Sequence, residues 1–110
     1  MHSSLSDLLG AVPQRAVEHL VREDGRFTLL RPKFTSGRLQ WFQKMLTRPH
    51  FKVKLDDVGT CLWAHMDGQR TGHDLVEILR LAFGERVEPA DERTAQFLHQ
   101  LAEGKFIRFP

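Results

Sequence analysis

The sequence has a single cysteine and no long apolar run. Cys61 alone can form neither an intrachain disulfide framework nor a zinc site built only of cysteines. No apolar stretch approaches the roughly 20 residues that cross a bilayer, and the N-terminus lacks a basic region followed by an apolar one. We therefore expect a cytoplasmic protein that has no membrane partner and whose fold depends on packing.

Groups that carry catalysis are also scarce. All serines lie before residue 37, in segments that read as an arm or a loop, and they form no triad with a base. The histidines show no metal-binding spacing, and the glycines stand singly rather than in a phosphate-binding motif. Cys61 and His65 share a helix face, but no third ligand accompanies them, so we interpret them as a structural pair. The sequence predicts no enzyme, no catalytic residue, no metal and no cofactor.

Charge is unevenly distributed along the 110 residues, a length that suits one small domain. Residues 1–55 hold ten Lys and Arg against four Asp and Glu, whereas residues 56–110 hold six against ten. Eight basic residues and no acid lie between 26 and 54, namely Arg26, Arg31, Lys33, Arg38, Lys44, Arg48, Lys52 and Lys54. A negatively charged partner suits this stretch, and the alternative is that the two halves pack together and neutralise each other.

The first half of the chain favours strands. Residues 1–14 have a short apolar pattern, stopped by Gly10 and Pro13, which predicts a mobile N-terminal arm with at most one helical turn. The dipeptide Asp24-Gly25 predicts a hairpin between strands near 16–22 and 26–31, with both turn residues at positive φ. Pro32 is expected to end this ladder because it has no N–H group to donate.

A further strand and three helices are predicted beyond this hairpin. Residues 35–50 form an insertion that is either a loop or a short basic helix, and alternating apolar residues from Phe51 to Leu55 predict a third, half-buried strand. The first helix is expected to start at an Asp56 cap, the second at a Thr71 capping box, and the third with Pro89 at its first position. Residues 105–109 read as a short terminal strand.

The stretch Val53-Lys-Leu-Asp-Asp-Val-Gly-Thr-Cys-Leu-Trp-Ala-His-Met-Asp-Gly-Gln-Arg-Thr-Gly-His-Asp-Leu-Val-Glu-Ile-Leu resembles the PqqD family. The resemblance extends to Phe97-Leu-His-Gln-Leu101 and Phe106-Ile107. It covers roughly residues 15–109, which we take with Pro110 as a PqqD-like domain over 15–110. It is best over 53–83, and the insertion at 35–50 departs from the family pattern.

The resemblance implies an α+β, winged-helix-like domain with a three-stranded antiparallel sheet followed by a three-helix bundle. It also implies a non-catalytic protein that binds the leader of a ribosomally made precursor peptide as an added strand and presents the peptide to a modifying enzyme, commonly a radical SAM protein. Carried onto this chain, the groove consists of Phe51, Lys52, Val53, Lys54, Arg93, Phe97, Gln100 and Leu101. Trp63 reads as a packing residue. Three roles stay open for the insertion: it covers the edge strand, it enlarges the groove, or it contacts the partner enzyme, with Trp41 and Phe42 as its candidate anchors.

Two other uses of this domain stay open. A winged-helix DNA-binding protein or transcriptional regulator has the same order of elements, but residues 85–104 carry five acids against two basic residues, which phosphates would repel. A homodimer through the exposed strand is the second alternative. If a peptide pairs with the predicted strand Phe51–Leu55, Val53→Pro is expected to remove one hydrogen-bond donor to the peptide and so weaken its binding.

Overall fold

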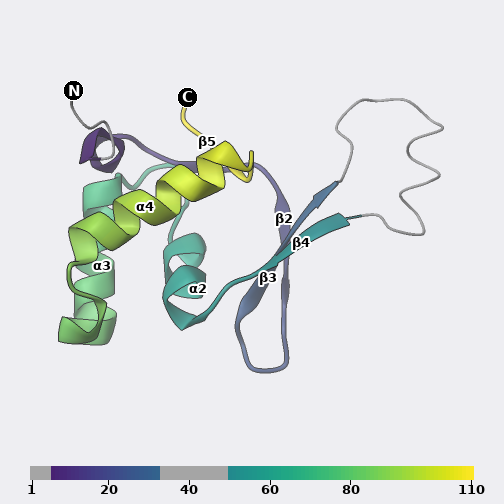
Figure 1. The fold of residues 1–110 in the computed structure, drawn as a ribbon, viewed down its shortest axis with the longest axis horizontal. Coiled ribbons are helices and arrows are strands. Elements are labelled where there is room, and N and C mark those ends of the chain that lie inside the picture. The colour runs from purple at the N-terminus through teal and green to yellow at the C-terminus, as the bar shows by residue number, and fades with distance from the viewer. Residues whose placement is uncertain (1–5, 33–49) are drawn as a thin grey trace.

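The structure is a computed structural model that describes residues 6–32 and 50–110. Its three-stranded antiparallel sheet has the order β2-β3-β4, followed by helices α2, α3 and α4 (Figure 1). The elements are η1 (Ser6–Gly10), β1 (Gln14–Arg15), β2 (Glu18–Val21), β3 (Phe27–Pro32), β4 (His50–Lys54), α2 (Asp57–Ala64), α3 (Gly72–Phe83), η2 (Gly84–Val87), α4 (Ala90–Glu103) and β5 (Ile107–Arg108). The predicted α+β class, with three strands before three helices, is confirmed. The predicted insertion, with Trp41 and Phe42, lies outside the described residues except for His50.

The hairpin between β2 and β3 turns at Glu23–Gly25. Gly25 donates to the carbonyl oxygen of Arg22 at 2.9 Å, and Arg22 donates to that of Arg26 at 2.7 Å. Gly25 has φ of 86°, whereas Asp24 is not among the described residues with positive φ. The expectation of two left-handed turn residues was therefore wrong. The loop has three residues between the Arg22–Arg26 pair, and in such loops only the last residue adopts the left-handed conformation.

The helices begin where capping chemistry places them. Asp56 accepts a hydrogen bond from the Gly59 amide at 2.8 Å, and Thr71 and Asp74 form the predicted capping box. Pro89 is the N-cap of α4 rather than its first residue. The reason is that the Glu88 carboxylate accepts from the Ala90 amide at 3.0 Å, which supplies the cap that proline lacks.

The N-terminal segment is part of the packed structure. Leu9, in the 3-10 helix η1, is 4% exposed and belongs to the core. A side chain at Gly72 would lie 2.6 Å from the Leu9 Cα atom, so glycine allows η1 to sit against the start of α3. This contact was not expected from the sequence, which predicted a mobile arm over residues 1–14. The pairing of β1 with β5, in which Arg15 lies opposite Ile107, was also not predicted.

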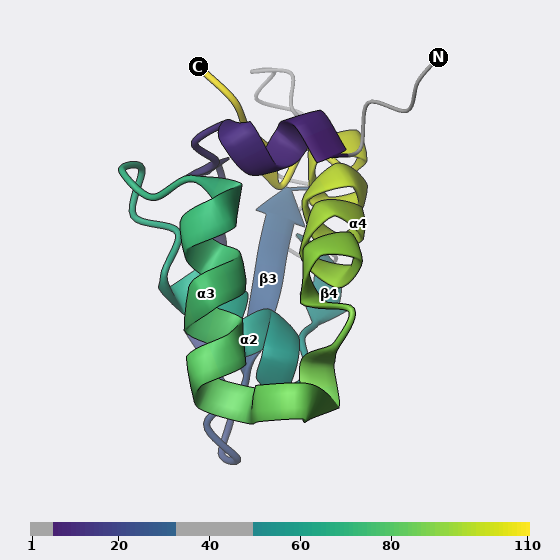
Figure 2. The same cartoon turned by 90° about the vertical axis from the view of Figure 1, so that its left-hand side faces the viewer.

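The core lies between the sheet and the helices. Figure 2 shows β3 behind α2, with α3 and α4 on either side of it. Trp63 of α2 is fully buried, and its indole N–H donates to Nδ1 of His19 at 3.2 Å. The His19 ring stacks on Phe27 with centroids 4.4 Å apart. The reading of Trp63 as a packing residue is confirmed. Among the described residues, no helix combines the length and the apolar character that crossing a membrane requires.

Candidate functional site

Strand β4 lies at one edge of the sheet. The register with β3 determines which of its residues direct their N–H and C=O groups toward β3 and which direct them toward the edge. The Leu55 amide donates to the carbonyl oxygen of Phe27 at 2.9 Å. In the register that places Leu29 opposite Val53, bonded and non-bonded pairs alternate along the ladder. The Leu29–Val53 pair is therefore a bonded pair. It follows that the N–H and C=O groups of Lys52 and Lys54 point away from β3, toward the open edge.

This register corrects one expectation from the sequence. Val53 was expected to donate its N–H to an added strand, but its N–H points into the ladder with β3. A proline at Val53 would therefore break the sheet itself. The donors available to a bound strand belong to Lys52 and Lys54.

The side chains of β4 alternate between the two faces of the sheet. Val53 packs against the core on the face that the helices cover, whereas Lys52 and Lys54 are exposed on the opposite face. The backbone of Phe51 pairs with Arg31, and its side chain lies outside the described part of the structure. Of the four predicted strand residues, Lys52 and Lys54 therefore offer backbone groups at the edge and ammonium groups on the exposed face.

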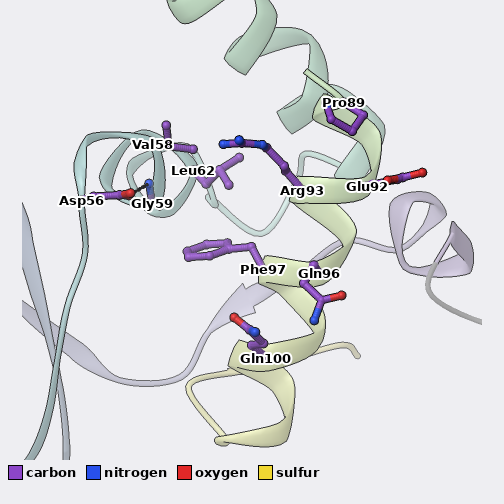
Figure 3. A pocket seen from close by; sticks show the side chains of 10 residues that line it. All are labelled: Asp56, Val58, Gly59, Leu62, Pro89, Glu92, Arg93, Gln96, Phe97 and Gln100. Carbon is purple, nitrogen blue, oxygen red and sulfur yellow. Dashed lines mark hydrogen bonds between the residues drawn. The ribbon is translucent and has the colours of Figure 1, made fainter. Parts of the chain in front are cut away.

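A groove of about 430 Å³ lies between the start of α2 and the exposed side of α4. Its lining consists of Asp56, Val58, Gly59, Leu62, Pro89, Glu92, Arg93, Gln96, Phe97 and Gln100 (Figure 3). Phe97 projects from α4 toward α2, and a Cβ atom at Gly59 would lie 3.3 Å from its Cε1 atom. Glycine at this position therefore lets the ring lie against the helix. Asp56 directly follows Leu55, which follows β4, so the groove continues from the end of the edge strand.

The structure brings together three of the four predicted α4 residues. Arg93, Phe97 and Gln100 line the groove. Leu101 is 5% exposed and lies in the core, so it supports α4 from within. The strand residues do not line the groove and instead form the edge that leads to it.

The α2 side of the groove was not predicted from the sequence. Val58 and Leu62 were not among the predicted site residues, and Leu62 is only 1% exposed, yet both line the groove. The spacing of Arg93, Gln96 and Gln100 on α4 places them on one face with Phe97, a pattern that was available in the sequence. Which face of α2 meets that stripe depends on packing between the helices and could not be read from spacing alone.

One guanidinium faces the groove. Arg93 extends from α4 toward α2, whereas Glu92 points away (Figure 3). Within residues 6–32 and 50–110, no ion pair involves Arg93. The Asp56 carboxylate is engaged as a helix cap. Asp57 is paired with Arg86 at 2.8 Å, and this hydrogen bond lowers the pKa of Asp57.

Among the described residues that line the groove, no nucleophile stands beside a base. On α2, the Cys61 sulfur atom lies 3.9 Å from Nδ1 of His65, and that nitrogen lies 2.8 Å from the Cys61 carbonyl oxygen. Burial raises the pKa of the Cys61 thiol, the opposite of what activates a cysteine. In the part of the chain that the structure describes, no three His, Cys, Asp or Glu side chains gather as metal ligands would. The groups available for binding at this site are the backbone groups of β4, the Phe97 ring and the cationic side chains of Lys52, Lys54 and Arg93.

The described residues form a small α+β domain in which the edge strand β4 leads to a partly apolar groove between α2 and α4. The model of the family described as Coenzyme PQQ synthesis protein D (PqqD) matches residues 49–107, which is more than half of the chain. The chain belongs to the PqqD family. The match begins at β4 and ends in β5, so it includes both the edge strand and the groove. No curated protein and no solved structure matches the chain at a significant level.

Proposed function

We propose that this protein binds a ribosomally made precursor peptide by strand addition at β4 and presents it to a modifying enzyme of the radical SAM type. The observation that carries the proposal is the outward direction of the Lys52 and Lys54 backbone groups beside the groove of α4. Membership of a family named for coenzyme PQQ synthesis supports a role in such a pathway. The protein itself acts as a binding partner and not as a catalyst.

The binding chemistry follows from these two features. Main-chain hydrogen bonds to Lys52 and Lys54 supply affinity that does not depend on the peptide sequence. Side chains on the helix-covered side of the added strand reach toward Phe97, where an apolar group is removed from water. The remainder of the peptide, with the residues to be modified, extends past the groove and stays accessible to the enzyme.

The test is a titration of the purified protein with the short peptides encoded beside its gene, followed by amide chemical shifts in NMR spectra. We expect shifts concentrated at Lys52–Lys54 and along Arg93–Gln100. Shifts confined to β2, the other edge strand, or no shift with any of the peptides, would overturn the proposal. A parallel titration with duplex DNA tests the alternative of a DNA-binding protein, for which the shifts should decrease steeply with added salt.

Contact with the enzyme is assigned to the insertion through Trp41 and Phe42. The double variant Trp41→Ala/Phe42→Ala is expected to bind the peptide as the wild type does but to bind the enzyme more weakly, because large aromatic anchors dominate protein interfaces. Affinity for the enzyme is measured with peptide already bound. Equal affinity for the enzyme in both proteins would remove these two residues from the interface.

A further inference from the structure

The exposed face of the sheet at β4 carries two ammonium groups, those of Lys52 and Lys54. Lys52 lies opposite Leu30 and Lys54 lies opposite Thr28, so no acid lies beside either lysine in the sheet. No ion pair in the described ranges involves either lysine. In the described sheet, β3 lies on one side of the two lysines, and the other side is the edge where a peptide strand would lie.

The opposite face of the same strand is apolar. Val53 packs against the core, and the groove beyond it contains Phe97, Val58 and Leu62. Residues that lie side by side on neighbouring strands project to the same face. A strand that binds this edge should therefore alternate between residues that suit the two lysines on one face and apolar residues that suit Val53 and the groove on the other.

We propose that the bound segment is an acidic strand with the pattern acid, apolar residue, acid. Its two carboxylates lie beside Lys52 and Lys54, and the residue between them faces Val53 and the groove. This inference rests on the proposed strand addition and specifies the class of peptide that the edge accepts. Arg93, which extends into the groove, provides a further site for a carboxylate at the end of the segment.

Charge also argues against a second copy of this chain as the occupant of the edge. Pairing of β4 with β4 of another molecule would bring the lysines of one strand close to those of the other. Like charges in neighbouring strands are destabilising, and lysine on an edge strand discourages such pairing. Lys52 and Lys54 therefore attract an acidic peptide and repel the lysines of a second copy of this chain.

The probe is a short synthetic peptide with a Glu-Val-Glu-Leu core and Ser/Gly flanks, compared with versions in which both Glu are replaced by Gln or by Lys. At low salt, replacement of both Glu by Gln is expected to weaken binding about four- to 25-fold, because each cross-strand charge pair contributes about two- to fivefold. The double variant Lys52→Glu/Lys54→Glu should instead prefer the lysine peptide. The matched control Lys105→Glu/Arg108→Glu makes the same change in net charge near β5 and should keep the preference for glutamate.

The outcomes separate the two proposals. Amide shifts at Lys52–Lys54 with equal affinity for all three peptides would overturn the acidic pattern and leave strand addition in place. A preference for glutamate that persists in the Lys52→Glu/Lys54→Glu variant would also overturn it. If neither these peptides nor the gene-encoded ones shift these amides, strand addition itself fails. Reversal of the preference only in the β4 variant supports both proposals.

Discussion

The Arg22 guanidinium donates a hydrogen bond to the carbonyl oxygen of Leu55 at 2.9 Å. Arg22 follows β2, whereas Leu55 lies where β4 passes into α2, so the contact spans the sheet from one edge strand to the other. The same guanidinium donates to the Phe27 carbonyl oxygen at 2.8 Å and to the Thr28 hydroxyl at 3.1 Å. It thereby holds the hairpin against the junction from which the groove begins.

Arg22→Met is therefore expected to lower the free energy of unfolding by about 2 kcal/mol, because partly buried carbonyl groups lose charged donors. The measurement is urea unfolding followed by circular dichroism. Arg26→Met is the matched control, since Arg26 lies in the same turn, is 47% exposed and forms an ion pair of 3.7 Å with Asp24 of that turn. Equal losses in the two variants would contradict the bridging role of Arg22.

A proline at Lys54 tests the open edge of β4. Because the Lys54 N–H points away from β3, Lys54→Pro removes a donor to the added strand and leaves the β3–β4 ladder intact. We expect the affinity for the precursor peptide to decrease about tenfold or more, through one lost hydrogen bond and the steric bulk of the ring. Isothermal titration measures the affinity, and circular dichroism verifies folding.

Val21→Pro is the control for this experiment. Val21 occupies the corresponding outward position on β2, where it is 64% exposed, so its proline variant changes the opposite edge in the same way. Lys54→Ala separates loss of the side chain from loss of the N–H. Unchanged affinity in Lys54→Pro, or an equal decrease in Val21→Pro, would exclude β4 as the edge that the peptide joins.

Local chemistry explains what the sequence predicted well. The caps at Asp56 and Thr71 were correct because a capping side chain bonds within three residues of its own position. The strand at β4 was correct because its alternation reflects one covered face. The contact between Leu9 and the start of α3 was missed because it depends on Gly72, far along the chain, leaving room for η1.

The candidate site divides along the same line. Arg93, Phe97 and Gln100 share one helix face and were predicted together, whereas Leu101, on the neighbouring face, lies in the core. The groove face and the core face of α4 are less than one helical turn apart. Apolar spacing alone does not specify which of these faces an apolar residue of α4 occupies. The hydrogen-bonding phase of β4 was likewise beyond sequence reasoning, because it depends on the register with β3.

Gly59→Ala tests how α2 shapes the groove. The added methyl group would lie 3.3 Å from Phe97, Asp56 and Leu55 atoms, so the Phe97 ring must shift outward. We expect weaker peptide binding and a changed ring shift of Phe97 in NMR spectra. Stability should change by less than about 1 kcal/mol, because the gain in helix propensity offsets the crowding. Gly10→Ala, which has open space around it, is the control, and an unmoved ring in Gly59→Ala would contradict the contact.

The acids around Arg80 make stability depend on pH. Arg80 donates to Glu88 at 2.7 Å, and this bond, aided by the Ala90 amide, lowers the pKa of Glu88 below its usual 4.5. A carboxylate whose pKa is lower in the folded state contributes stability above its unfolded pKa, and the contribution is lost as the pH falls through the folded value. The thermal midpoint should therefore decrease from about pH 6 to about pH 3. The thermal midpoint of the Glu88→Gln variant should decrease less over this range than that of the control Glu85→Gln, which replaces an exposed acid in the preceding turn. Equal dependence of the midpoint on pH in the two variants would show that the Arg80–Glu88 pair does not contribute.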